Sequence, residues 1–334
     1  MLKCAIIGLG GLGKKHLGNI LGMEDKVKLV ALCDIEKEKL SAGVQTNLGE
    51  IKTTTDFSNF NFYTDAEEML EKEDLDFVII ALPTYLHAKY ALKAFEKGLH
   101  VFCEKPMART SEEAQQMLDM SKKVGKKLMI GQCLRFSPTY NVLKDYYENG
   151  KLGKLLRVDF HRYSLVPVWG WQHWYEDFEK SGCAAMDLHV HDVDVINYIF
   201  GKPNKVSSIA SHDRTKFDSI STRYFYDNFF ITAVCDWGFS DSFGFRRGYI
   251  ASFEKGALEM KDSGEVVISP VDGPQYNVAV QAVDTYVAEM KDFIDAIEKD
   301  RDITVLVPES TKDSVDTVLA EIKSAETGET VTLK

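Results

Sequence analysis

The sequence predicts an α/β domain with a doubly wound parallel sheet, followed by an α+β domain with a large, mostly antiparallel sheet. Over about the first 130 residues, apolar runs alternate with segments of helical periodicity, as in βα units. Beyond about Cys133 aromatic residues become dense, strand-like runs follow one another, and helical periodicity returns near the carboxyl end. We therefore place a first domain at residues 1–131 and a second at 132–334.

The first strand runs directly into a glycine-rich fingerprint. Residues 3–7 form an apolar run, a helix is expected to about Leu21, and the turn between them has the pattern GxGxxG. Its residues are Gly8, Leu9, Gly10, Gly11, Leu12 and Gly13. The first glycine permits the tight turn, the second lets a pyrophosphate approach the backbone, and the third allows the helix to pack on the strand. This turn predicts a Rossmann-type dinucleotide site, with phosphates at the amino end of the helix.

An acidic residue follows the second strand at the expected distance. The apolar run Val27–Cys33 ends at Asp34, which lies 34 − 13 = 21 positions after Gly13. A carboxylate here would accept hydrogen bonds from a ribose 2′-hydroxyl and repel a 2′-phosphate, which favours NAD over NADP. Lys37 and Lys39 are close enough in sequence to reach a phosphate, so NADP stays possible. The alternative role for Asp34 is to cap a following helix.

The later strands of the first domain end in polar residues. The apolar strand 75–82 stops at Pro83-Thr84, and the strand ending at Cys103 is followed by Glu104-Lys105-Pro106. Helices are expected at 86–97 and 111–123, and a last strand at 127–131 completes about six parallel strands. Ligands bind outside the carboxyl ends of such strands, so Lys105 is expected in the ligand crevice, with Pro106 restricting its backbone. The alternative is a surface lysine in a turn.

The second domain contains one segment rich in acids and histidines. Read as a helix, residues 182–200 place Asp187, His191, Asp194 and Tyr198 on one narrow polar stripe. Read as a strand, they would place Asp187, His189 and His191 on one face, as in a zinc site. The length of the segment favours the helix, so no metal is predicted. A purely structural Asp/His pair is the remaining alternative.

Taken together, these motifs resemble one family over nearly the whole chain. They are the fingerprint with His16, Ala81–Thr84 with His87, Glu104-Lys105-Pro106, and Asp187-x-x-x-His191-Asp192-x-Asp194. The chain resembles the Gfo/Idh/MocA family of NAD(P)-dependent sugar and polyol oxidoreductases. The resemblance implies a Rossmann domain, a second domain with an open-faced sheet that mediates homodimers or homotetramers, and a cis bond before Pro106. It also implies a catalytic set of Lys105, Asp187 and His191.

The resemblance further implies the residues around the two ligands. Cofactor contacts are expected from Pro83, Thr84, His87, Glu104 and Lys105, together with the glycine turn and Asp34. Substrate contacts are expected from Lys105, Asp187 and His191, and from Arg135, which matches an Arg-Phe pair after the last Rossmann strand. Trp174 belongs to an aromatic cluster whose flat faces suit a sugar ring, although such clusters are more often core.

The residues themselves predict the chemistry of alcohol oxidation. A group must accept the hydroxyl proton as hydride leaves carbon, and His191 titrates near neutral pH. Asp187 could orient that imidazole, and the Lys105 ammonium could stabilise the developing alkoxide. Lys105 could instead be the base, if burial beside a cationic nicotinamide lowered its pKa. We expect an NAD-dependent dehydrogenase of a sugar, inositol or related polyol; the alternative is a non-catalytic dinucleotide-binding sensor of the same fold.

Composition excludes several other classes of protein. The 334 residues carry a net charge of −11, which argues against nucleic acid or an anionic membrane as a partner. No apolar run approaches the roughly 18 residues of a membrane span, and no secretion signal is visible. The six cysteines are scattered singly, which predicts reduced, buried thiols. We therefore expect a cytoplasmic protein with a small-molecule substrate.

Overall fold

The computed structural model describes residues 1–40, 44–46, 49–51 and 59–333. The chain divides into two compact units, each built from segments that are distant in sequence. The first unit contains 1–132, 169–174 and 286–312, and the second contains 133–168, 175–285 and 313–334. Helix α10 (Pro308–Thr327) therefore begins in the first unit and continues in the second. In the described part of the chain, no helix is both long enough and apolar enough to cross a membrane.

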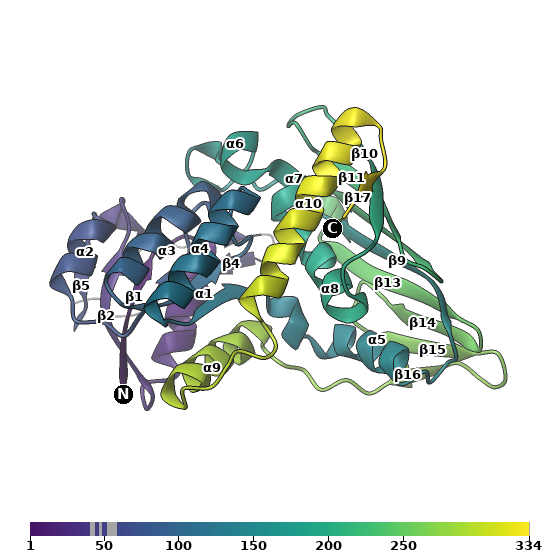
Figure 1. The fold of residues 1–334 in the computed structure, drawn as a ribbon, viewed down its shortest axis with the longest axis horizontal. Helices are drawn as coiled ribbons and strands as arrows, with labels where there is room; N and C mark the ends of the chain where they lie inside the picture. The colour runs from purple at the N-terminus through teal and green to yellow at the C-terminus, as the bar shows by residue number, and fades with distance from the viewer. Residues whose placement is uncertain (41–43, 47–48, 52–58, 334) are drawn as a thin grey trace. The chain divides into compact units, whose positions relative to one another are not determined.

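The first unit is built on a six-stranded parallel sheet in the order β5-β2-β1-β6-β7-β8 (Figure 1). Its strands are β1 (Leu2–Ile7), β2 (Val27–Cys33), β5 (Asn61–Tyr63), β6 (Phe77–Ile80), β7 (His100–Glu104) and β8 (Leu128–Gly131). Strand β6 is buried along its whole length, as expected for a strand covered on both faces. The doubly wound parallel sheet is confirmed. Its order reverses between β1 and β6, so the ligand crevice is expected at the carboxyl ends of these strands.

Helices connect these strands, and a short hairpin of β3 (Val44–Thr46) and β4 (Gly49–Ile51) lies outside the sheet. The helices are α1 (Gly11–Leu21), α2 (Ala66–Lys72), α3 (His87–Glu96), α4 (Ser111–Val124) and, from the later part of the chain, α9 (Thr285–Glu298). Thr110 begins α4 with a capping box, because its hydroxyl accepts from the Glu113 N–H while the Glu113 carboxylate accepts from the Thr110 N–H. Helices α1, α3 and α4 agree with the predicted ones to within a few residues, whereas the hairpin of β3 and β4 was not predicted.

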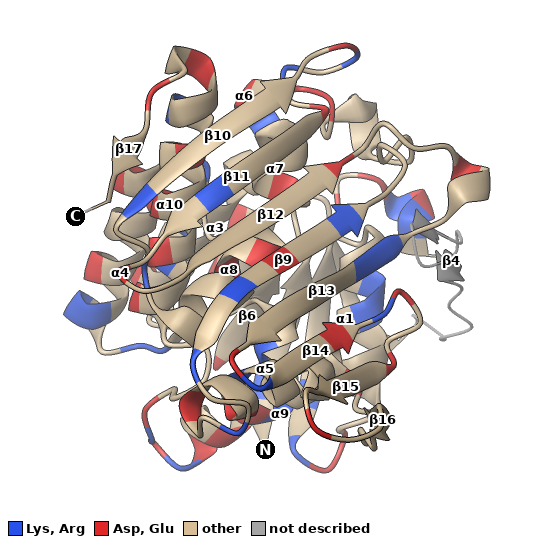
Figure 2. Ribbon diagram, turned by 90° about the vertical axis from the view of Figure 1, so that its right-hand side faces the viewer, with Lys and Arg blue, Asp and Glu red and all other residues tan. Residues whose placement is uncertain are grey.

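The second unit contains a nine-stranded sheet in the order β16-β15-β14-β13-β9-β12-β11-β10-β17 (Figure 2). Its strands are β9 (Leu155–Tyr163), β10 (Lys205–Ser211), β11 (Ser219–Phe225), β12 (Phe230–Asp236), β13 (Arg246–Phe253), β14 (Gly256–Met260), β15 (Val266–Pro270), β16 (Tyr276–Val278) and β17 (Val331–Thr332). All neighbours are antiparallel except β9 and β12. The large, mostly antiparallel sheet is therefore confirmed.

One face of this sheet is covered by helices of the same unit. These are α5 (Pro138–Glu148), α6 (Phe178–Ser181), α7 (Cys183–Asp187) and α8 (Val190–Phe200), of which α7 and α8 contact the middle strands. The strands alternate buried and more exposed residues, so the opposite face carries exposed apolar side chains, among them Ile209, Phe230 and Ile250. All six cysteines are buried and free, as predicted.

The sequence did not reveal the central strand β9. Its inward positions include Arg162, whose charge interrupts the alternation of apolar and polar residues by which a half-buried strand is found. That guanidinium is buried and donates to both oxygens of Asp192. The strand is therefore stabilised by an ion pair that the local pattern does not show.

Candidate functional site

The turn between β1 and α1 has the geometry that its three spaced glycines require. Gly8 has a φ of +96°, and a Cβ there would lie 2.4 Å from the Ala81 carbonyl oxygen. A Cβ on Gly13 would lie 1.9 Å from the Gly8 carbonyl oxygen, so the helix approaches the turn as closely as predicted. By contrast, a Cβ on Gly10 would meet no protein atom within 4 Å. The space beside Gly10 is therefore open to a ligand.

The amino end of α1 lies in this turn, between Leu9 and Gly13. Gly10 is the N-cap and has no side chain to satisfy the first N–H groups, and the first turn contains no acidic residue. Gly11 and Leu12 present backbone N–H groups with the positive end of the helix dipole. This helix end can therefore accept a phosphate.

Asp34 lies directly after β2 and is almost fully buried. Its carboxylate accepts hydrogen bonds from the Leu9 N–H at 2.7 Å and from the Glu36 N–H at 3.0 Å. The Lys39 ammonium lies 3.6 Å from one carboxylate oxygen. Lys14 is buried nearby; burial lowers its pKa, and Asp34 acts in the opposite direction. Asp34 is thus tied to the glycine turn rather than capping a regular helix.

The end of β6 is fixed by a buried histidine. Strand β6 is followed by Pro83 and the buried Thr84, at the same carboxyl edge of the sheet as the glycine turn. His87 begins α3, and its two ring nitrogens lie 2.8 Å from the carbonyl oxygens of Leu82 and Pro106. Burial lowers the pKa of His87, against the influence of the two carbonyl groups. This ring therefore links the loops that follow β6 and β7.

Strand β7 ends at Glu104, and Lys105 is the first residue beyond it. The bond between Lys105 and Pro106 is cis, as the family resemblance implied. Glu104 is buried and Lys105 is half-buried. One Glu104 oxygen accepts from the Lys105 backbone N–H at 3.2 Å. The first unit thus brings Lys105 to the edge of the sheet that carries the other predicted cofactor residues.

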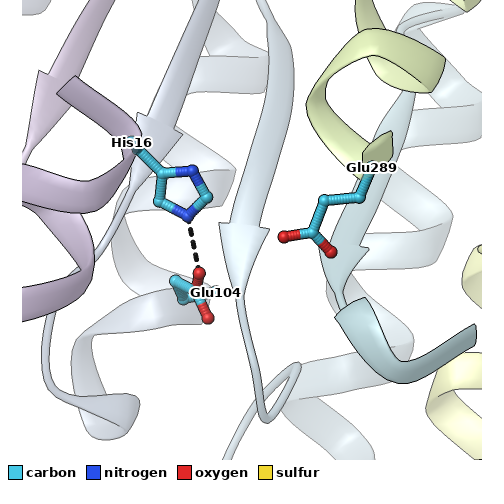
Figure 3. A group of neighbouring side chains, drawn as sticks. All are labelled: His16, Glu104 and Glu289. Atoms are coloured by element: carbon cyan, nitrogen blue, oxygen red, sulfur yellow. Dashed lines mark hydrogen bonds and ion pairs between the residues drawn. The ribbon is translucent and has the colours of Figure 1, made fainter. Parts of the chain in front are cut away.

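Behind Glu104 lies a cluster that the sequence did not predict. His16 of α1 donates from Nε2 to Glu104 Oε1 at 2.6 Å, and Glu289 of α9 points its carboxylate toward the pair (Figure 3). One ligand atom of each residue lies within 4.8 Å of the others, and all three residues are buried. Among the described residues this is the one group with the spacing of a metal site. Only helix α9, far along the sequence, supplies the third member, so no local pattern indicates it.

In the second unit, the segment with acids and histidines is helical but not continuous. Helix α7 ends at Asp187 and α8 begins at Val190. The His189 N–H bonds to the Ala184 carbonyl five residues earlier, which widens the turn and changes the helical phase. The predicted helix is therefore interrupted between Asp187 and Val190, and the shared polar stripe of Asp187 and His191 stays a prediction. The strand alternative with a zinc site at Asp187, His189 and His191 is wrong, because both flanking segments are helices.

Three polar residues of this segment form buried ion pairs. Asp192 pairs with Arg162, Asp194 pairs with Arg135, and His189 Nε2 lies 3.1 Å from Glu321 Oε2. Tyr224 also contacts His189 Nε2 through its hydroxyl at 3.0 Å. Burial opposes the charge on His189, but Glu321 and Cys235 outweigh it and raise the pKa of His189 well above its usual range. These contacts account for His189 and Asp192, which the sequence left unexplained.

Asp187 and His191 differ from these neighbours in being only half-buried. Asn197 and Tyr198 share this intermediate exposure, and the other polar residues of α8 are buried. The half-buried positions are those from which a side chain can reach a ligand. The catalytic roles of Asp187 and His191 stay predictions.

The remaining substrate residues, Arg135 and Trp174, are both buried. The guanidinium of Arg135 donates to Asp194 at 2.8 and 2.7 Å, and Ser314 donates to the same carboxylate at 2.9 Å. Arg135 therefore belongs to an internal network of the second unit. Trp174 is grouped with the first unit. Their contacts with substrate stay predictions.

Comparison with known proteins matches both units to one family. The family described as "Oxidoreductase family, NAD-binding Rossmann fold" matches residues 2–132, and "GFO/IDH/MocA C-terminal domain" matches residues 140–259. The chain is similar to inositol 2-dehydrogenase of Salmonella typhimurium, with 28% identity over 211 residues, covering 62% of this chain and 57% of the relative. It is 30% identical over 214 residues to scyllo-inositol 2-dehydrogenase (NAD(+)) of Bacillus subtilis, covering 64% and 57%.

A solved structure of levoglucosan dehydrogenase, in complex with NADH and levoglucosan, shares the fold. Its TM-score is 0.83 at 19% sequence identity, and the match covers 99% of both chains. The sequence matches, by contrast, span a little over half of the length of the curated relatives.

Proposed function

Since the chain belongs to the Gfo/Idh/MocA family of oxidoreductases, we propose that it is an NAD(P)-dependent dehydrogenase. It transfers hydride between a nicotinamide cofactor and a secondary alcohol of a sugar, inositol or related polyol. The observation that carries this proposal is the position of Lys105. It stands at the carboxyl edge of the parallel sheet with the glycine turn and Asp34, and its backbone N–H donates a hydrogen bond to Glu104.

The residues of the first unit fit a dinucleotide. Space is open beside Gly10, the N–H groups at the start of α1 face that turn, and Asp34 lies at the end of the neighbouring strand. When bound, the nicotinamide supplies the hydride acceptor. Asp34 favours NAD, and Lys39 beside it keeps NADP possible.

Residues of the chain accept the hydroxyl proton of the substrate and stabilise the charges that develop. We assign His191 as the acceptor of the hydroxyl proton and Asp187 as the group that orients the imidazole and stabilises its charged form. The Lys105 ammonium donates a hydrogen bond to the alkoxide oxygen as negative charge develops there. Lys105 could exchange roles with His191, and the pH profiles of the two single variants distinguish these cases.

The substrate class follows from the relatives, two of which are named inositol dehydrogenases. The test measures turnover of a panel of inositols, aldoses and sugar acids with NAD and NADP. The formation of reduced cofactor is monitored by the absorbance of its nicotinamide. Turnover of at least one polyol, lost in Lys105→Ala, is the expected result. Tight NAD binding with no turnover of any member would favour the sensor alternative.

We also propose that the protein forms a homodimer or homotetramer through the open face of the nine-stranded sheet. Ile209, Phe230 and Ile250 are exposed on this face, on three different strands. Figure 2 shows the nine strands side by side, with uncharged residues along most of their length and charged residues at separate positions on several strands. A second copy would remove the apolar side chains from water.

A further inference from the structure

We propose that Glu104 and His16 are positioning residues that hold the backbone of Lys105, and that neither binds the cofactor. This inference rests on the proposed function, because it explains how the proposed catalytic lysine is kept in place. It also gives a different role to Glu104, which the family resemblance placed among the cofactor contacts.

The two oxygens of Glu104 have different partners. Oε1 accepts from His16 Nε2 at 2.6 Å, and Oε2 accepts from the Lys105 N–H at 3.2 Å. The carboxylate lies over Gly131 of β8, where a Cβ would come within 3.3 Å of Oε1. Because this last residue of β8 is a glycine, the Glu104 carboxylate has room to fold back toward its own strand. It therefore fixes the peptide that leads into Lys105.

His16 fixes Glu104 in turn, from the helix of the glycine turn. The imidazole is fully buried and packs against the ring of Phe102, with centroids 5.1 Å apart. Phe102 contacts Phe293, so the pair lies among apolar side chains. A hydrogen bond between a carboxylate and an imidazole is strong in such surroundings, because water does not compete for either group. The orientation of Glu104 is consequently well defined.

The other side of Lys105 is held independently. The Pro106 carbonyl lies 2.8 Å from Nδ1 of the buried His87, whose Nε2 reaches Leu82. The backbone is thus held by Glu104 before the lysine and by His87 after its proline. Two fixed points around Lys105 define the position and direction from which its side chain leaves the backbone, which is part of the preorganisation that a catalytic group requires.

The distance between His16 and Glu104 distinguishes a hydrogen bond from a pair of metal ligands. Two ligands of one zinc ion, each about 2.0–2.1 Å from the metal, would stand farther apart than the 2.6 Å between His16 Nε2 and Glu104 Oε1. That distance is typical of a short charge-assisted hydrogen bond. Glu289 lies beside the pair and belongs to helix α9, far along the chain from the strand that leads into Lys105. Glu289→Gln therefore serves as a matched control for Glu104→Gln. Both residues are buried, and in both the change to Gln removes the charge and keeps the size of the side chain.

The experiment compares Glu104→Ala, Glu104→Gln, His16→Ala and Glu289→Gln with the wild-type protein. A misplacement of about 1 Å at a catalytic group can cost about 100-fold in rate. We expect kcat to fall by about that factor in Glu104→Ala and His16→Ala, while the Kd for NADH stays within about threefold. Glu104→Gln should recover at least about tenfold of the loss, because its amide oxygen can still accept from Lys105 and its NH₂ can donate to the other tautomer of His16. Glu289→Gln should keep kcat within about threefold.

Three outcomes would overturn the proposal. A raised Kd for NADH in Glu104→Ala with unchanged kcat would make Glu104 a cofactor ligand. If the loss of kcat in Glu104→Ala and His16→Ala disappears when the rates are divided by the concentration of folded protein, the two residues have only a structural role. Stoichiometric zinc or manganese in the purified protein, lost in Glu289→Gln, would make the cluster a metal site. Crystal structures of the wild type and Glu104→Ala give a readout that does not need turnover. A Lys105 backbone in the same position in both structures would refute the positioning role, even if no substrate is found. Inactivity of the wild type, by contrast, would refute only the proposed function.

Discussion

In the proposed chemistry the Lys105 ammonium donates a hydrogen bond to the oxygen on which the alkoxide charge develops. Removing one donor to a developing oxyanion typically costs about 100- to 1,000-fold in kcat. We expect a loss of that size in Lys105→Ala, with the Kd for NAD changed by less than about tenfold. Steady-state kinetics and cofactor titration by fluorescence measure the two quantities.

Lys97→Ala is the matched control, since Lys97 precedes the same strand but is exposed and forms an ion pair with Glu71. It should behave as the wild type. Full activity in Lys105→Ala would contradict the assignment of this lysine.

His189 should make the second unit sensitive to alkaline pH. Its pKa is raised in the folded protein, so its contribution to stability is fully present below the unfolded value of about 6.5 and is lost as pH rises through the folded pKa. The stability of the wild type should therefore fall relative to His189→Gln between neutral and alkaline pH. Urea-unfolding midpoints of both proteins, measured at intervals across that range, test this; parallel curves would contradict it.

Residues of this kind limit what can be predicted from sequence. The partners of His189, Asp192 and Asp194 are Glu321, Arg162 and Arg135, which come from distant segments of the second unit. A helical wheel shows on which face of a helix a side chain lies, but it does not show which residue of another segment contacts that side chain. The helical wheel therefore placed Asp194 on a polar stripe and left His189 and Asp192 without an explanation, although all three belong to internal ion pairs.

At the scale of elements, the turn between β1 and α1 contains one glycine that the fold requires and another that faces the proposed ligand. A Cβ on Gly13 would overlap the Gly8 carbonyl at 1.9 Å, whereas a Cβ on Gly10 would meet no protein atom within 4 Å. Gly13→Ala should therefore destabilise the first unit. Gly10→Ala should keep the wild-type Tm but weaken NAD binding by about tenfold or more, because the methyl group occupies the space of the pyrophosphate.

Calorimetry and NAD titration on the two variants provide the test. Each variant is the control for the other, since both add one methyl group within the same turn. Unchanged NAD affinity in Gly10→Ala would show that the phosphates bind elsewhere.

Elements with a simple periodicity were predicted well, and those whose pattern is interrupted were not. The parallel strands are continuous apolar runs bounded by glycine and polar residues, so their positions follow from the sequence. Strand β9 carries Arg162 on its inward side, and α7 is separated from α8 by one widened turn at His189. In both places a buried charge or a single hydrogen bond overrides the local pattern, and only the tertiary structure shows it.

At the scale of the whole molecule, the order of elements was sufficient to identify both folds, because a doubly wound sheet and a large antiparallel sheet have different connections. The discontinuous composition of the units was not foreseen. Residues 286–312 return to the first unit after eight of the nine strands of the large sheet, and the last strand, β17, follows them. This return supplies α9, and with it Glu289, to the cluster behind Glu104. No pattern within α9 indicates that destination.

The open face of the nine-stranded sheet leads to the last prediction, which concerns assembly. Ile209 is 76% exposed and Ile250 is 49% exposed on this face, and their burial between two copies would favour association by about 25 cal/mol for each Å² of apolar surface. We expect the wild type to be a dimer or tetramer by light scattering after size-exclusion chromatography. Ile209→Glu should convert it to monomers, because a carboxylate would be buried without a partner. Val271→Glu, at a position that is 69% exposed in the turn after β15, should leave the oligomer intact. A monomeric wild type would refute the assembly and leave the dehydrogenase proposal unaffected, since the two proposals rest on different residues.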